Sequence, residues 1–323
     1  MISVNARALE IARRMAADAE ALGLVVSQLA NGATVLDAGV HTSGSLEAGR
    51  LFAEVCLGGL GKVRFAHQTF VGAQDPIENN CWLPSLSVSV SHPVVACMAS
   101  QYAGWAVKAD KYFAMGSGPA RARYAGEPLF EKLAYRDQAE VAVLTLEGRE
   151  LPTQAVADKV AKKCGVAPEN LYLLIAPTAS LVGSVQVAAR VVETGLHKML
   201  EVGFDIDTVV TGYGTCPLPS IAKNDLKAIG RTNDAVLYGG QAWYTVETGD
   251  ADIEAVIERL PSSSSRDYGT PFYDLFKRYD GDFYKIDPLL FSPAEVFINN
   301  LSSGHVFHAG QVDAEMIQRV LLA

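Results

Sequence analysis

Two apolar runs separated by a helical segment restrict the folds open to this chain. EVAVLTLEG (140–148) and LYLLIAP (171–177) are nearly continuous apolar runs of strand length, a pattern typical of buried strands. Residues 152–164, between them, begin at a proline and show helical spacing. Helical and strand patterns alternate from end to end of the chain, so the sequence predicts an α/β protein with mixed sheets.

The remaining elements are predicted from periodicity and turn residues. Asn31-Gly32 predicts a tight hairpin turn. The expected helices cover 4–22, 46–57, 93–103, 251–260, 271–279 and the residues from 312 onward. The expected strands cover 23–29, 33–38, 83–91, 105–110, 207–212 and 235–247, with a hairpin over 294–310. We expect two domains: a larger α/β domain formed by 1–84 and 179–323, and an inserted two-layer domain at 85–178.

Charge and hydropathy exclude several classes of partner. The formal net charge of −9 argues against a nucleic-acid backbone or an anionic membrane as the main partner, because both need a basic surface. No stretch reaches 18 apolar residues, so no membrane span is expected. The first 15 residues, MISVNARALEIARRM, lack the apolar core of a signal peptide, which favours a cytoplasmic protein.

Metal and thiol chemistry are not expected. The five cysteines contain no C-x-x-C pair, which fits neither a disulfide framework nor a zinc knuckle. His305 and His308 would point to opposite faces of a strand, and no third ligand is near. Cys56, in EVCLGGLG, is better explained by packing than by nucleophilic catalysis.

One apolar helix carries a thin line of polar residues. In SLVGSVQVAARVVETGLHKML (180–200), Gln186, Arg190, Glu193 and His197 fall within an arc of about 60°. Two interpretations follow from the residues alone. In the first, this is a mostly buried helix with one solvent-exposed edge and an ordinary ion pair. In the second, the line faces a cleft where a carboxylate beside a guanidinium acts on a substrate.

Three glycine-containing stretches are candidate binding loops. DKYFAMGSGPARARY (110–124) combines glycines with arginines that could clamp an anion, although a plain turn explains it equally well. TGYGTCPLP (211–219) and GRTNDAVLYGG (230–240) are weaker signals of the same kind. None is a Walker A loop or a dinucleotide fingerprint, and no G-x-S-x-G elbow is present.

Taken together, six segments resemble the methenyltetrahydromethanopterin cyclohydrolase family. They are VNARALEIARRM, AEVCLGGLG, KYFAMGSGPARA, LLIAPTASLVGSVQVAARVVETG, GRTNDAVLYGG and FYKIDP, which run in the family's order from residue 4 to 288. The resemblance implies an enzyme of one-carbon metabolism that reversibly hydrolyses a methenyl-tetrahydromethanopterin to its N5-formyl form. It also implies a cytoplasmic homotrimer of two-domain α/β subunits, with the active pocket between the domains and no metal or redox cofactor.

The resemblance also assigns residues. The family's R-V-V-E motif is Arg190 to Glu193 here, which makes Glu193 the expected general base on water and Arg190 the group that orients it. This mechanism requires both side chains to be shielded from bulk solvent. The residues expected beside the pterin or its anionic tail are Gly116, Ser117, Gly118 and Arg121. Those expected to line the same cleft from the other shared motif are Arg231, Thr232, Asn233 and Asp234.

One segment departs from the family pattern, and two rival functions stay open. FVGAQDPIENNCWLPS (70–85) is longer than in archaeal members, which favours the version found in methylotrophic bacteria, whose pterin tail differs. The rivals are another enzyme acting on the same pterin, such as a formyl transferase or a methylene dehydrogenase, and a non-catalytic binding module. A dehydrogenase would need a nicotinamide site, and the dinucleotide fingerprint is absent.

Overall fold

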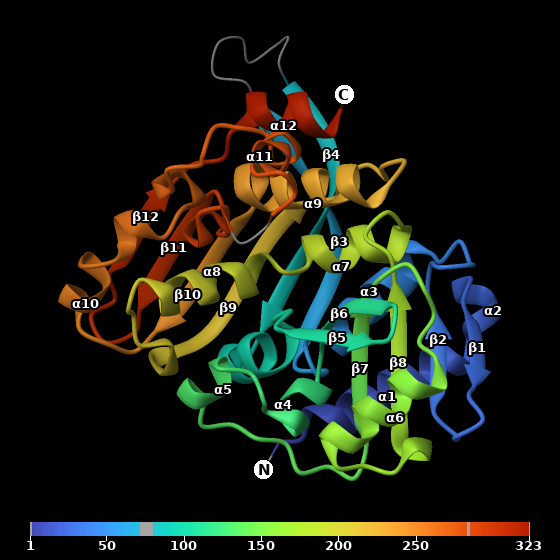
Figure 1. Ribbon diagram of the computed structural model, residues 1–323. Coiled ribbons are helices and arrows are strands. Elements are labelled where there is room, and N and C mark those ends of the chain that lie inside the picture. Colours follow the sequence, from blue (N-terminus) through green and yellow to red (C-terminus); the bar gives the residue numbers. More distant parts are fainter. Residues whose placement is uncertain (1, 72–79, 283–284, 323) are drawn as a thin grey trace. The chain divides into compact units, whose positions relative to one another are not determined.

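Two compact units, each with its own sheet, make up the chain (Figure 1). The computed structural model describes residues 2–71, 80–282 and 285–322. Unit 1 comprises Met1–Lys62 and Val94–Gln186, and unit 2 comprises Val63–Pro93 and Val187–Ala323. Each unit contains one six-stranded sheet with parallel and antiparallel pairs, so the predicted α/β class with mixed sheets is confirmed.

The sheet of unit 1 is parallel at its centre and antiparallel toward its edges. Its strand order is β1-β2-β8-β7-β6-β5. The strands are β1 (Val25–Gln28), β2 (Thr34–Asp37), β5 (Trp105–Ala109), β6 (Tyr112–Ser117), β7 (Ala142–Glu147) and β8 (Leu171–Ala176). The pairs β2/β8 and β8/β7 are parallel. The hairpin predicted at Asn31-Gly32 is confirmed, because β1 and β2 pair antiparallel and Gly32 has a φ of +90°.

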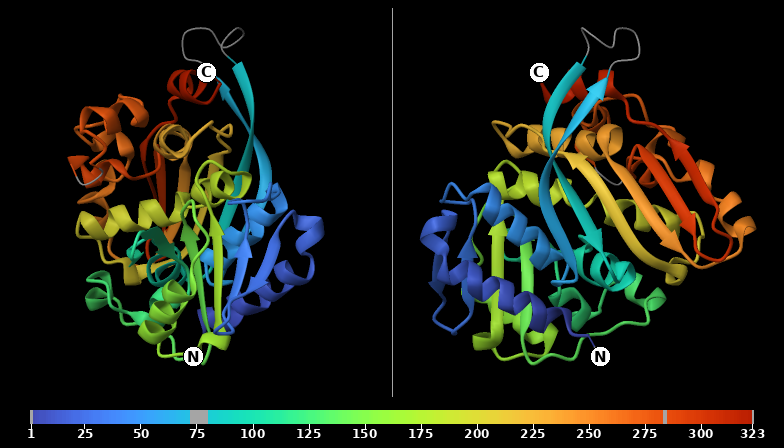
Figure 2. Two further views of the ribbon diagram at one scale, coloured as in Figure 1. Left: turned by 45° about the vertical axis from the view of Figure 1, so that its right-hand side comes forward. Right: turned by 180° about the vertical axis from the view of Figure 1, so that it is seen from behind.

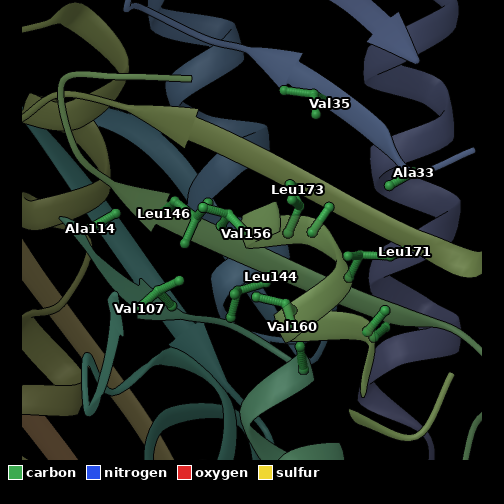
Figure 3. Packing of buried hydrophobic residues seen from close by; sticks show 14 of the residues in the cluster. Ala33, Val35, Val107, Ala114, Leu144, Leu146, Val156, Val160, Leu171 and Leu173 are labelled. Atoms are coloured by element: carbon green, nitrogen blue, oxygen red, sulfur yellow. The ribbon is translucent and has the colours of Figure 1, made fainter. Parts of the chain in front are cut away.

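Helices cover both faces of this sheet, which is why β7 and β8 are apolar throughout. The helices on one face are α1 (Val4–Ala17), α2 (Ala19–Leu22) and α3 (Leu46–Cys56), which share a core with Val143 and Leu174. On the other face, α6 (Gln154–Cys164) packs Val156 and Val160 onto Leu144 and Leu173 (Figure 3). Unit 1 also contains the short helices α4 (Ala120–Tyr124) and α5 (Leu129–Lys132) and a π-helix, Val94–Gln101.

The sheet of unit 2 has the strand order β12-β11-β10-β9-β4-β3. Its strands are β3 (Gly61–Val71), β4 (Asn80–Val90), β9 (Val209–Pro217), β10 (Gln241–Val246), β11 (Glu295–Asn300) and β12 (Val306–Gly310). The long strands β3 and β4 lie side by side at one edge, in blue and cyan in Figure 2. The helices are α8 (Val191–Glu201) and α9 (Asp225–Gly239), which contact the sheet, α11 (Phe272–Arg278) and α12 (Ala314–Leu321), which pack on α9, and α10 (Asp250–Glu254).

The two units do not coincide with the domains expected from the sequence. Residues 1–62, expected in the larger domain, cluster with 94–186 instead. The reason is a long-range strand pairing, since β2 runs parallel to β8 with Thr34 opposite Tyr172. Local periodicity predicts that a segment is a strand, but it contains no information on which distant strand will be its neighbour.

Three of the expected elements are wrong in their type or extent. The single helix predicted for 180–200 is interrupted at Ala189 and Arg190, giving α7 (Leu181–Ala188) and α8. The first half of the strand predicted for 235–247 belongs to α9, because a short buried apolar run such as Ala235–Tyr238 has the same pattern in a helix as in a strand. The helix predicted for 251–260 is only the short α10 followed by a 3₁₀ turn, Ile257–Arg259. None of the helices described is long and apolar enough to cross a membrane.

Candidate active site

Arg190 and Glu193 lie together where α7 ends and α8 begins. Arg190 is the N-cap residue of α8, and Glu193 lies in its first turn. The Arg190 Nη1 and Glu193 Oε2 atoms are 3.6 Å apart. The two residues are only 9% and 4% exposed, so the shielding from bulk solvent that the mechanism requires is present. A carboxylate in the first turn is also stabilised by the positive end of the helix dipole.

Two glycines of β9 let the first turn of α8 approach the sheet closely. A Cβ atom on Gly212 would lie 2.6 Å from Val192 Cγ1, and one on Gly214 would lie 2.8 Å from Val191 Cγ1. The stretch TGYGTCPLP, predicted as a binding loop, is therefore mainly strand, and these glycines serve helix packing. The signal in the sequence is their spacing of two, which places both on one face of a strand.

Tyr244 and Gly195 hold the same turn of α8 from β10. The Tyr244 hydroxyl donates a hydrogen bond of 2.8 Å to the Val192 carbonyl oxygen. A Cβ atom on Gly195 would collide with that hydroxyl, so only glycine fits there. The site residues predicted from the sequence include neither Gly195 nor Tyr244. Their roles depend on contact between a helix and a strand 52 residues apart, which no local pattern contains.

The break between α7 and α8 divides the line of four polar residues between two helices. Gln186, in α7, donates from Nε2 to Glu147 Oε2 over 3.0 Å, and Thr178 donates to the same carboxylate. His197 Nε2 lies 3.8 Å from Glu201 Oε1. Within the line, Arg190 and Glu193 form an ion pair.

The Gly116–Ser117–Gly118 motif lies at the buried end of β6. Ser117 Oγ is 2.8 Å from Thr145 Oγ1, and Cys56 Sγ is 3.3 Å from the same Thr145 atom. Gly118 has a φ of +93°, and its N–H donates to the Ser100 carbonyl oxygen over 2.8 Å. These contacts join α3, β6 and β7 inside unit 1. A role in substrate binding stays a prediction for this motif.

Arg121 is completely buried and already has partners for its guanidinium group. Its Nη2 lies 2.6 Å from Glu127 Oε2, and its Nη1 donates to the carbonyl oxygens of Met98 and Ser100, each at 3.0 Å. Phe130 and Tyr102 face the guanidinium as aromatic rings. These contacts identify Arg121 as a residue that ties α4 to the segment around Ser100. Binding of an anionic substrate tail by Arg121 stays a prediction.

The motif Arg231–Asp234 lies on helix α9 rather than in a loop, so its side chains point in different directions. Arg231 Nη1 donates to Ser220 Oγ over 2.9 Å. Thr232 Oγ1 and Asn233 Nδ2 donate to carbonyl oxygens one turn earlier in the same helix. Asp234 accepts from the Phe272 N–H over 2.8 Å, and burial raises the pKa of its carboxyl group to about 7. Contact of these four residues with the substrate stays a prediction.

The raised pKa of Asp234 predicts a pH-dependent stability. An Asp with a raised folded-state pKa keeps its proton in the folded chain between about pH 4 and 7 while the unfolded chain loses it, so its contribution declines as pH rises through that window. Asp234→Asn cannot titrate and keeps an acceptor for Phe272. We expect the unfolding free energy of this variant relative to the wild type to rise from pH 5 to pH 8 by at most about 3 kcal/mol, with a matching rise in relative melting temperature. The exposed Asp207→Asn is the control, and equal pH dependence in both variants would contradict the assignment.

The two histidines of the C-terminal hairpin have separate carboxylate partners. His305 Nδ1 lies 2.7 Å from Asp250 Oδ2, and His308 Nε2 lies 2.8 Å from Glu295 Oε1. Across residues 2–71, 80–282 and 285–322, no group of three or more His, Cys, Asp and Glu side chains is placed to hold a metal ion.

Comparison with known proteins agrees with the resemblance in the sequence. The model of the family described as Cyclohydrolase (MCH) matches residues 3–321. A protein of Methanocaldococcus jannaschii named methenyltetrahydromethanopterin cyclohydrolase is 49% identical over 99% of this chain and 98% of its own length. Proteins with the same name from Methanothermobacter marburgensis and Methylobacillus flagellatus are 46% and 45% identical, over 99% and 98% of this chain and 99% and 94% of their own lengths.

The comparisons do not decide which version of the pterin tail is used. Identity to the Methylobacillus protein is no higher than to the Methanocaldococcus protein, and most of the distinguishing segment, 72–79, lies outside the described residues. Family and reaction class, in contrast, are decided by a match over nearly the whole chain. This chain belongs to the cyclohydrolase (MCH) family and is a hydrolytic enzyme.

Proposed function

We propose that this enzyme reversibly hydrolyses N5,N10-methenyl-tetrahydromethanopterin to the N5-formyl compound, with Glu193 as general base. The observation that carries the base assignment is the shielded pair of Glu193 and Arg190 at the start of α8, 3.6 Å apart. The proposed substrate is supported by the relatives, which are 45–49% identical to this chain and share one name. A non-catalytic binding module has no comparable support.

The reaction needs an activated water rather than an activated substrate. The methenyl carbon lies between two nitrogens that share a positive charge, so it is already electrophilic. Glu193 would accept a proton from water as the water oxygen bonds to that carbon, giving a carbinolamine. Return of the proton from Glu193 to N10 lets the carbon–N10 bond break, and loss of the hydroxyl proton leaves the N5-formyl product.

Arg190 would serve as a positioning residue for this carboxylate. Its Nη1 atom lies 3.6 Å from Glu193 Oε2, where the positive charge favours the ionised form of the carboxyl group. The mechanism needs no metal or redox cofactor, because no electrons are transferred and the carbon requires no Lewis acid. The homotrimeric state, the pocket between domains and the cytoplasmic location implied by the resemblance stay predictions.

An absorbance assay tests the proposed reaction. Purified protein mixed with methenyl-tetrahydromethanopterin is expected to bleach the near-ultraviolet absorbance of the methenyl group with many turnovers and without added nicotinamide. A binding protein would instead shift the spectrum in proportion to its own concentration. The same assay with methenyl-tetrahydrofolate tests whether folates are accepted. Bleaching limited to one equivalent of protein would contradict the proposal.

A further inference from the structure

Glu147 is the last residue of β7, a strand whose other residues are all buried. Two side chains donate hydrogen bonds to its carboxylate: Thr178, just after β8, donates to Oε1, and Gln186 Nε2, in α7, donates to Oε2 over 3.0 Å. Thr178 and Gln186 are only 4% and 3% exposed, whereas Glu147 is partly exposed. The two donors therefore fix the orientation of a carboxylate in a residue that is not fully enclosed.

The partners of the Glu147 carboxylate leave part of its hydrogen-bonding capacity unused. Both donors are neutral, and in the part of the chain that the structure describes no Lys, Arg or His forms an ion pair with Glu147. Each carboxylate oxygen can accept two hydrogen bonds, and each accepts one from these side chains. One acceptor position on each oxygen is left for a ligand that offers two parallel donors.

Glu147 also lies where open α/β sheets bind their ligands. β7 and β8 are adjacent and parallel, so their carboxyl ends lie together (Figure 1). The chain leaving β7 enters α6, which packs on the face shown in Figure 3. The chain leaving β8 enters α7, whose Val182 belongs to the core on the opposite face. Neighbouring parallel strands whose connections leave to opposite faces form a topological switch point, and ligands bind outside the carboxyl ends of such strands.

We propose that Glu147 binds the amide and amino N–H groups of the substrate's pterin ring. This inference rests on the proposed function, which supplies the pterin. The pyrimidine part of a pterin carries N3–H and the 2-amino group side by side, which is the arrangement of donors that a guanidinium offers to a carboxylate. Thr178 and Gln186 are positioning residues, because they bind the carboxylate rather than the ligand. The alternative role for Glu147 is only to tie β7 to α7, and it predicts no specific effect on ligand binding.

Calorimetric titration of the full chain with tetrahydromethanopterin tests the proposal without turnover, because this compound lacks the methenyl bridge. Glu147→Gln keeps the size of the side chain and can still bond to Thr178 and Gln186, but one of its acceptors becomes an NH₂ group that opposes the ligand's donors. We expect Kd to rise about 10–100-fold, as for loss of a hydrogen bond to a charged group. Glu150→Gln is the matched control, because it removes the same charge from the exposed segment just after β7, and we expect no change in Kd.

A second pair of ligands identifies the group that Glu147 contacts. Pterin and 4-hydroxypteridine differ only in the 2-amino group, and displacement of tetrahydromethanopterin by each gives its Kd. The wild type is expected to prefer pterin by about tenfold or more, and Glu147→Gln is expected to bind the two compounds about equally. A purely structural role would weaken both compounds to the same extent and leave the preference unchanged. Equal displacement by the two compounds from the wild type would also contradict the proposal.

Failure of this inference and failure of the proposed function give different results. If the methenyl substrate is hydrolysed but Glu147→Gln binds tetrahydromethanopterin as the wild type does, the assignment of Glu147 is wrong and the reaction stands. If tetrahydromethanopterin binding depends on Glu147 but the methenyl absorbance is not bleached, the assignment stands and the reaction is wrong. Absence of saturable tetrahydromethanopterin binding to the wild type would overturn the assignment of Glu147.

Discussion

Glu193→Gln is expected to lower kcat by about 10²–10⁴-fold while pterin binding changes only a few-fold. The amide has nearly the same shape as the carboxylate but cannot accept a proton from water. The change also removes the ion pair with Arg190, which lies 3.6 Å away. Stopped-flow loss of methenyl absorbance gives kcat, and titration of the variant with the methenyl substrate gives the binding constant.

Glu201→Gln is the matched control for this substitution. Glu201 is the last residue of the same helix, is 39% exposed and lies near His197 rather than Arg190. Its replacement removes one carboxylate from α8 with no expected change in kcat. Turnover of Glu193→Gln within a few-fold of the wild-type rate would show that another group accepts the proton.

Arg121→Met is expected to lower the stability of the fold by about 3–5 kcal/mol. Arg121 is 0% exposed, and the side chain of its partner Glu127 is only 8% exposed. Removing the guanidinium leaves a largely buried carboxylate and the Met98 and Ser100 carbonyl oxygens without their donor. Chemical denaturation followed by circular dichroism measures the loss.

Two further variants distinguish this structural role from substrate binding. Arg123→Met removes a cation two residues away whose Nη2 contact to the Gly165 carbonyl oxygen is 3.5 Å, and we expect a cost below about 1 kcal/mol. Arg121→Met combined with Glu127→Gln should recover part of the loss, because the unpaired charge is removed too. An Arg121→Met protein of wild-type stability but with a raised KM would instead identify Arg121 as a substrate ligand.

The elements and residues predicted correctly are those whose sequence patterns extend over only one or two turns or one strand. Helices such as α3 and α6, and the buried strands β7 and β8, were predicted with errors of a few residues, because periodicity and capping residues act over one or two turns. Arg190 and Glu193 were predicted as neighbours for the same reason. Arg231–Asp234 was predicted as a loop and lies in helix α9, because a polar segment between a glycine and a short apolar run fits a loop before a strand as well as a helix.

By itself, the sequence determined the α/β class, the family and the spacing that makes Arg190 and Glu193 neighbours. Each of these depends on residues close together in the chain or on long motifs. Only the tertiary structure decided that the helix breaks at Ala189 and Arg190, and that Tyr244 and two glycines of β9 hold the turn bearing Glu193. The tertiary structure also decided which groups bind the Arg121 guanidinium and that β2 pairs with β8. The physical reason is that these features depend on contacts between distant segments, whose packing energies appear only once the chain is folded.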